Sequence, residues 1–263
     1  MEVKPCRCKP KSASALSDED QEMYKKDNDF LELIATGDLA GVETMIKGGQ
    51  EVNVGNEQGE SSCHKAAKLT EIAMLKTLIK HGAHADYSDS YGNRPINIAM
   101  QMGEDCLEHV NYLLSLKDTK GGPAVNLQLA NFKTGNTLLH DAAWIGNTEA
   151  CEALLKTGGF KDLIEAHNKQ GQTAMHVAAF RAPKSLVSAL VDAGANSTAP
   201  EKNGRRISKE TPEMMAQAMG REDTANYLRD LNTAVNAVKF GARMKMGAKK
   251  SNEEVEQPVG SSA

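Results

Sequence analysis

Apolar residues recur at helical spacing in short blocks along this chain, and polar stretches separate the blocks. Two such blocks place apolar residues three or four apart: Leu39, Val42, Met45 and Ile46 in the first, and Ile72, Leu75, Leu78 and Ile79 in the second. Blocks of this kind predict short helices with one apolar face. A glycine follows several blocks, at Gly49, Gly82, Gly158 and Gly194. Glycine at these positions favours a helix end with a left-handed backbone.

A sequence motif recurs with the same phase as these blocks. Residues 136–143 (NTLLHDAA) return as residues 172–179 (QTAMHVAA), and a weaker copy (SSCHKAA) spans 61–67. Degraded copies begin at Arg94 and Thr211, and the least regular copy begins at Asn28. A unit of about 33 residues that carries Thr-Pro-Leu-His-x-Ala resembles the ankyrin repeat. The resemblance implies an all-α solenoid of about six helix pairs with β-hairpin loops, spanning residues 28–232 and starting near 28, 61, 94, 137, 173 and 211.

Each part of the motif has a physical role. Thr or Ser caps the first helix, Pro fits the first helical turn, and paired alanines allow close helix packing. In the family that the chain resembles, the motif histidine ties one unit to the next, so we assign His64, His140 and His176 to structure rather than catalysis. The third unit carries ten extra residues and the fifth carries five. These insertions are either drift in loops or enlarged binding fingers.

The two ends differ from the repeats. We expect residues 1–27 to be a disordered leader and residues 251–263 to be a disordered tail. Residues 233–250 form a basic, helix-compatible extension with Lys239, Arg243, Lys245, Lys249 and Lys250. The extension is either an amphipathic segment that binds an acidic partner or a membrane surface, or a helix on the last unit followed by a basic tail.

Charge and missing motifs exclude several functions. With 31 basic and 35 acidic residues, the chain has no overall attraction for nucleic acid or anionic lipid, and no apolar run is long enough for a membrane span. Cys6 and Cys8 fall short of a zinc site, and no phosphate loop or nucleophile motif is present. We therefore expect no cofactor, no metal and no enzymatic activity. The five cysteines suggest no disulfide framework, which favours the cytoplasm, with the nucleus as a second location.

The resemblance implies where a partner would bind. The two residues that follow each alanine pair would line the groove formed by the first helices: Lys68, Leu69, Gln101, Met102, Trp144, Ile145, Phe180 and Arg181, with Ala218 and Met219 in the last unit. Hairpin-tip candidates are Tyr91, Lys133, Lys169 and Arg205. Trp144 either faces the groove or folds back into the core. Because aromatic residues and arginine dominate binding energies, the groove centred on Trp144 and Phe180 is the candidate site.

These observations predict a protein-binding adaptor or scaffold that is a monomer on its own. The basic hairpin tips favour a partner with an acidic segment. Two alternatives stay open from the sequence: a structural component of a cytoskeletal or ciliary assembly, and an inhibitory or regulatory subunit of an enzyme.

Overall fold

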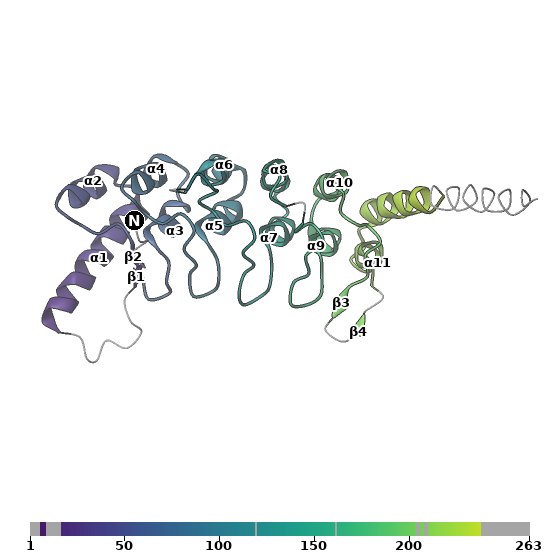
Figure 1. Ribbon diagram of the computed structural model, residues 1–263, viewed down its shortest axis with the longest axis horizontal. Helices are drawn as coiled ribbons and strands as arrows, with labels where there is room; N and C mark the ends of the chain where they lie inside the picture. Colours follow the sequence, from purple (N-terminus) through teal and green to yellow (C-terminus); the bar gives the residue numbers. More distant parts are fainter. Residues whose placement is uncertain are drawn as a thin grey trace, which may run out of the picture.

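The computed structural model describes residues 6–8, 17–118, 120–160, 162–203, 206–207 and 210–237. Helices of these residues pair in order along an elongated stack (Figure 1). The first helices of the pairs are α1 (Asp18–Thr36), α3 (Ser62–Ala66), α5 (Pro95–Gln101), α7 (Leu138–Ile145), α9 (Ala174–Arg181) and α11 (Pro212–Ala218). The second helices are α2 (Leu39–Lys47), α4 (Ala73–Lys80), α6 (Leu107–Ser115), α8 (Thr148–Lys156) and α10 (Lys184–Asp192), and helical residues 222–237 complete the sixth pair. A short 3₁₀ helix, η1 (Gly103–Cys106), precedes α6.

Two layers of helices define the stack. In Figure 1, α2, α4, α6, α8 and α10 form the upper layer, the first helices lie below them, and the long loops project from the lower edge. The alanine pairs of α3, α7 and α9 are fully buried, so neighbouring first helices lie close together. Leucines from the second helices, such as Leu75, Leu113 and Leu154, are also fully buried. The core is therefore continuous from unit to unit, as stacked repeats require.

The loops between the pairs contain very little strand. β3 (Lys202–Asn203) and β4 (Arg206–Ile207) form an antiparallel hairpin in the last loop, with Lys202 opposite Ile207. Four earlier loops are each closed by a backbone hydrogen bond across the loop, for example from Asp89 N to Asn93 O at 2.8 Å. Neighbouring loops are joined in turn, as Ser90 N donates to Gln58 O at 2.8 Å. Lys169 N likewise donates to Thr134 O, and Asn131 Nδ2 donates to Tyr91 O between these two pairs of loops. The first four loops thus form a row that is held together by backbone and side-chain hydrogen bonds.

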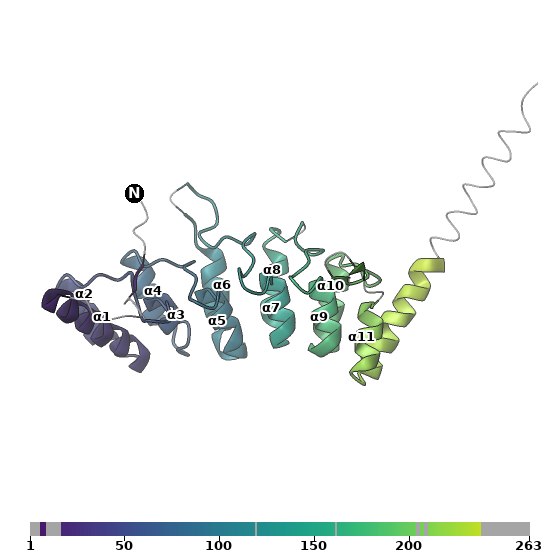
Figure 2. The ribbon, with the colours of Figure 1, turned by 90° about the horizontal axis from the view of Figure 1, so that it is seen from below.

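The predicted left-handed glycines are confirmed, and the insertion in the third unit has a defined structure. Gly49, Gly82, Gly158 and Gly194 follow the second helices with φ between 71° and 94°. The extra residues after α6 fold into a loop that is visible beside that helix in Figure 2, and an isolated bridge joins Lys117 to Pro123.

The expectation of a disordered leader over 1–27 is wrong for its last ten residues. Helix α1 begins at Asp18, and the Ser17 hydroxyl accepts from Asp20 N while Asp20 Oδ2 accepts from Ser17 N. The acidic run that suggested disorder instead complements the positive end of this helix. Two further leader residues form β1 (Arg7–Cys8), which pairs in parallel with β2 (Val54–Gly55). Residues 1–5 and 9–16 of the leader, the tail over 251–263 and residues 238–250 of the basic extension lie outside the described residues, whereas 233–237 continue the last helix.

Candidate protein-binding surface

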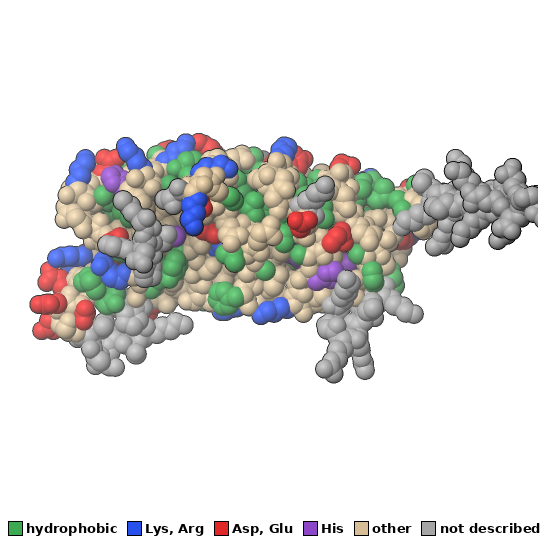
Figure 3. All heavy atoms as spheres, in the orientation of Figure 1, with side chains coloured by type: hydrophobic (Ala, Val, Ile, Leu, Met, Phe, Trp, Pro, Cys, Tyr) green, Lys and Arg blue, Asp and Glu red, His purple; other side chains and the backbone are tan. Residues whose placement is uncertain are grey.

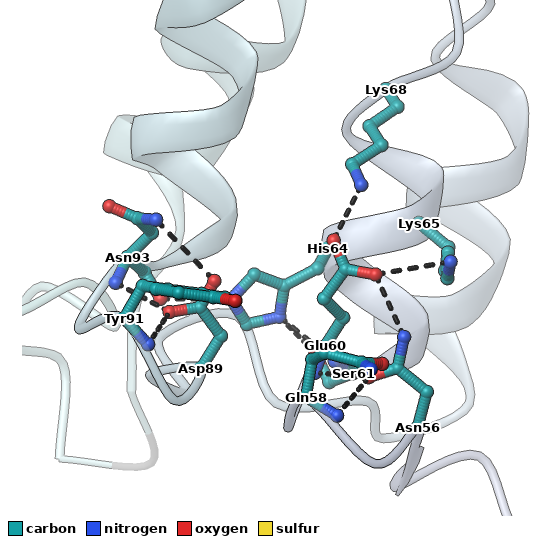
Figure 4. Close-up of polar contacts among 10 residues, drawn as sticks. All are labelled: Asn56, Gln58, Glu60, Ser61, His64, Lys65, Lys68, Asp89, Tyr91 and Asn93. Carbon is teal, nitrogen blue, oxygen red and sulfur yellow. Dashed lines mark hydrogen bonds and ion pairs between the residues drawn. The ribbon is translucent and has the colours of Figure 1, made fainter.

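Two of the motif histidines, His64 and His140, connect their units to the loop that follows. His64 Nδ1 accepts from Ser61 N at 3.0 Å and lies 2.8 Å from the Ser61 hydroxyl, while Nε2 lies 3.0 Å from Asn93 O in the following loop (Figure 4). His140 repeats this arrangement with Thr137 and with Gln172 O at 2.8 Å. The structural role predicted for these two histidines is therefore confirmed, and the geometry requires the Nε2–H tautomer.

Burial keeps these imidazole rings neutral. The pKa of His140 falls to about 4, mainly because burial disfavours the charged ring, and the pKa of His64 is lowered for the same reason. A neutral ring with its proton on Nε2 donates to a carbonyl and accepts at Nδ1, as the observed contacts require. These groups are occupied within the fold and are not available for acid–base chemistry.

The third unit makes the same connection with different residues. Arg94 replaces the capping Thr, and its buried guanidinium bonds to Asp86 Oδ1 at 2.9 Å and to Asn126 O at 2.7 Å. Asn97 replaces the histidine and donates to Asp141 Oδ2 at 2.7 Å. Burial raises the pKa of Asp141 to about 6. Bonds from a guanidinium to backbone carbonyl groups and from an amide to Asp141 thus connect the third unit to the next loop and helix where the motif is degraded.

The groove candidates lie in a row at the ends of the first helices, which we call the first-helix row: Lys68, Leu69, Gln101, Met102, Trp144, Ile145, Phe180, Arg181 and Met219. Trp144 is 50% exposed, so the alternative that it folds back into the core is wrong. The Arg181 guanidinium stacks on the indole ring, 4.4 Å from its centroid. Phe180, Met102 and Met219 are also exposed. The row therefore presents large apolar side chains from four successive units.

The other members of the first-helix row differ in how far their side chains are exposed for contact with a partner. Leu69 and Ile145 are half-buried and pack against the core. The exposed Lys68 forms an ion pair with Glu60, which Lys65 also contacts at 3.1 Å, as Figure 4 shows. This double pairing and other hydrogen bonds outweigh burial and lower the pKa of Glu60 to about 2. Gln101 is exposed at the end of α5.

The loop candidates form a second cluster, which we call the loop-tip cluster: Tyr91, Phe132, Lys133 and Lys169. Lys133 Nζ lies 4.7 Å from the centroid of the Tyr91 ring. Lys169 Nζ donates to Phe132 O at 2.6 Å. Phe132 is exposed and was missed by sequence reasoning, although an aromatic residue directly before Lys133 in a polar loop is a usable signal. Arg205 lies outside the described residues.

The rest of the described surface is mixed in character. On the face drawn in Figure 3, apolar side chains alternate with charges of both signs and do not merge into one broad patch. Among the described residues, no three His, Cys, Asp or Glu side chains are grouped so that they could hold a metal ion. Within the same part of the chain, the helices are too short or too polar to cross a membrane.

Known proteins resemble this chain over most of its length. The family model of ankyrin repeats in three copies matches residues 31–122, 116–201 and 139–239. The chain therefore belongs to the ankyrin-repeat family, whose repeats are modules for protein–protein interaction and are generally not enzymes.

Several relatives share the repeats. The human SH3 and multiple ankyrin repeat domains protein 2 is 27% identical over 194 residues, or 72% of this chain and 9% of that protein. Mouse Rabankyrin-5 is 24% identical over 70% of this chain and 21% of its own length. Rat diacylglycerol kinase iota is 36% identical over 38% of this chain and 10% of its own length. The chain thus spans only a tenth to a fifth of these relatives.

A solved structure has the same fold. It is a chain from the complex of the predatory endopeptidase Bd0816 of Bdellovibrio bacteriovorus with immunity protein Bd3460. The TM-score is 0.63 at 23% identity, and the match covers 76% of this chain and 96% of that one.

Proposed function

We propose that this protein is an adaptor that binds a protein partner through the first-helix row, with Trp144, Phe180 and Arg181 at the centre. The observation that carries the proposal is the exposed indole of Trp144 under the Arg181 guanidinium, 4.4 Å from the ring centroid. Residues of these types contribute most when a partner excludes water from them.

The backbone around these residues supports a preorganised surface. Trp144 lies in the last turn of α7, which packs against α9, the helix that carries Phe180 and Arg181. The buried alanine pairs and the His140 connection to the next loop fix both helices before any partner arrives. A partner that binds such a surface loses little conformational entropy in ordering it.

The charges favour an acidic segment in the partner. Arg181, Lys133 and Lys169 all lie against an aromatic ring or a carbonyl group, and no carboxylate contacts them among the described residues. Their positive charge is therefore not neutralised by a carboxylate in the described part of the chain. An acidic segment that runs along the first-helix row toward the loop-tip cluster would complement both surfaces.

The test is quantitative affinity purification from the cells that express the protein, with wild type compared with a Trp144→Ala/Phe180→Ala double variant. Two central residues are each worth about 2 kcal/mol, so the affinity of a true partner falls by roughly a thousandfold. The matched control is Leu129→Ala/Val235→Ala, which removes two exposed apolar side chains outside the first-helix row. Both variants are checked by circular dichroism.

Loss of one set of proteins from the double variant, with no loss from the control, supports the proposal. A purified candidate is then titrated into wild type, where Trp144 is the sole tryptophan. Binding at the row is expected to shift its emission to shorter wavelength as the indole is buried. Partners that bind both variants as tightly as wild type would remove the first-helix row as the binding site.

A further inference from the structure

An N-terminal pair of cysteines is held against the repeats in a defined position. β1 pairs with β2 in the register Arg7 to Val54 and Cys8 to Gly55, and Arg7 N donates to Asn53 O at 2.8 Å. Side chains alternate along a strand, so Cys6 and Cys8 share the face opposite to Arg7. Their two sulfur atoms lie 3.6 Å apart and both thiols are free.

The opposite face of β1 anchors the strand. The Arg7 guanidinium donates two hydrogen bonds to the Asp27 carboxylate on α1, at 2.8 and 2.6 Å. The Asp27 side chain is almost fully buried and also accepts from Gln50 Nε2 at 2.8 Å. A bidentate pair with a buried carboxylate has strict geometric requirements, so it fixes the position of the strand and of the two thiols.

The repeat beneath the thiols provides space for them. A Cβ atom at Gly55 would lie 2.8 Å from Cys8 Sγ and 3.2 Å from Cys6 Sγ. Gly55 directly precedes Asn56, whose N–H closes its loop. In the other three loops the closing N–H belongs to Asp89, Asn131 or Asn168, and the residue before it is not glycine but Ser88, Ala130 or His167. The glycine therefore occurs in the one of these four loops that contacts the cysteine pair.

The two thiols differ in environment. Cys6 is buried, and the neighbouring Cys8 together with burial raises its pKa well above the usual range. Cys8 is half-exposed, and its hydrogen bond with Cys6 lowers its pKa to about 7. Near neutral pH, the accessible thiol is therefore partly ionised while its buried neighbour keeps its proton, and the thiolate is the reactive form.

We propose that Cys6 and Cys8 form a redox-active dithiol, in which Cys8 reacts with hydroperoxides and Cys6 then closes an intramolecular disulfide. This site is separate from the first-helix row and does not depend on the proposed adaptor function.

The chemistry balances with hydrogen peroxide as the oxidant. The Cys8 thiolate attacks one peroxide oxygen, the O–O bond breaks, and the departing hydroxide takes up a proton to give water and a sulfenic acid on Cys8. Cys6 sulfur then attacks Cys8 Sγ, the S–O bond breaks, and the hydroxyl group leaves as water with the Cys6 proton. Two electrons pass from the sulfur atoms to the peroxide, and a thiol reductant reverses the reaction.

Oxidation is expected to strain β1. Residues i and i+2 of an extended strand are about 6.6 Å apart at Cα, near the upper end of the range that a disulfide spans. Closing the bond brings the sulfur atoms from 3.6 Å to about 2 Å and shortens the strand. We therefore expect faster hydrogen exchange at the Arg7 amide in the oxidised protein, because the bond to Asn53 O weakens.

The test uses the full-length reduced protein with a chelator present, stoichiometric hydrogen peroxide, and peptide mapping after alkylation. We expect a disulfide between Cys6 and Cys8, and native alkylation of Cys8 at least about tenfold faster than that of Cys151. Cys63 and Cys151 are internal references, since burial raises the pKa of each to about 12. Cys6→Ser should trap the Cys8 sulfenic acid for dimedone labelling, and Cys8→Ser should abolish both products.

Several results would overturn the assignment. Cys8 could react no faster than Cys151, or the disulfide could form only after denaturation or between two chains. Protection from alkylation that the chelator removes would point to a metal site instead of a redox site. The serine substitutions lie in the N-terminal segment before the first helix pair, and circular dichroism checks that each variant remains folded.

Discussion

Removing Arg94 tests whether the stability of the third unit depends on the Arg94 contacts that replace the usual Thr–His contacts. The Arg94 and Asp86 side chains are only 5% and 12% exposed, and their charged atoms lie 2.9 Å apart. The guanidinium also bonds to Asn126 O at 2.7 Å and to Leu129 O at 3.2 Å. Arg94→Ala leaves the Asp86 carboxylate buried without its cation, and it removes one donor from each of the Asn126 and Leu129 carbonyl groups.

The magnitude follows from burial. Removing one partner of a buried ion pair costs about 3–5 kcal/mol, because the remaining charge stays desolvated. An exposed pair offers the control: Lys76 and Glu108 are 48% and 67% exposed at 2.9 Å, and such pairs contribute about 0–1 kcal/mol. We therefore expect Arg94→Ala to lower the free energy of unfolding several times more than Lys76→Ala.

Urea denaturation followed by circular dichroism measures the global effect, and hydrogen exchange measures the local one. The Asn126 amide donates to Asp86 Oδ2 at 2.8 Å, so its exchange should accelerate when Arg94 no longer holds that carboxylate. The double variant Arg94→Ala/Asp86→Asn should recover part of the loss, because it removes the unpaired charge.

Equal losses for Arg94→Ala and Lys76→Ala would refute the reasoning. So would a double variant that is less stable than Arg94→Ala alone, since the unpaired Asp86 charge could then not be the source of the loss.

Three further predictions rest on single contacts. Gly92→Ala should lower the free energy of unfolding by about 1–2 kcal/mol because φ is 82°, and by more because the new Cβ would lie 2.6 Å from Asn131 Oδ1. Gly82→Ala is the control, with φ 89° and open space around the new Cβ, so urea denaturation should show only the loss that comes from φ. Asp141→Asn should remove one source of pH dependence from the free energy of unfolding. Because burial raises the folded pKa of Asp141 from 3.8 to about 6, wild type should gain stability relative to the variant as pH falls from 6 to 4. A difference in stability that stays constant across that range would contradict this. Arg181→Gln should increase acrylamide quenching of Trp144 while changing stability by less than about 1 kcal/mol, because the stacked guanidinium shields an exposed ring.

Sequence reasoning predicted the fold well where local signals repeat. The apolar spacing of Leu75 and Leu78 placed both in the core, and the recurring His64 and His140 predicted the contacts between units. Both signals lie within one unit and depend on helical geometry alone. They needed no information about distant parts of the chain.

The N-terminal segment was missed because its partners are distant in sequence. Arg7 contacts Asp27, 20 residues away, and β1 pairs with residues more than 40 positions further along. An acidic run such as Asp18–Asp20 fits both a disordered leader and the first turn of a helix. Only the contacts of Phe30, Leu31 and Ile34 with the core decide between them, and those residues lie beyond the run itself.

The candidate surface was predicted in part. The position directly after the alanine pair places Trp144 at the end of its helix, and the structure leaves it exposed as expected for the groove. The sequence did not reveal that Lys68 is paired with Glu60, eight residues before it, or that Lys133 lies over Tyr91 in the preceding loop. Such contacts depend on how loops of different units stack, which motif spacing alone does not specify.

The third unit indicates which property of the repeat the fold requires. Arg94 and Asn97 abandon the Thr–His chemistry, yet Arg94 reaches the next loop at Asn126 O and Asn97 reaches Asp141 on α7. The requirement is therefore a buried donor that spans adjacent units, whether it is a neutral imidazole or a guanidinium. The difference matters for the candidate surface, because Asp141 lies on the same helix as Trp144. A unit with a degraded motif thus still holds in place the helix that carries the central residue of the proposed binding site.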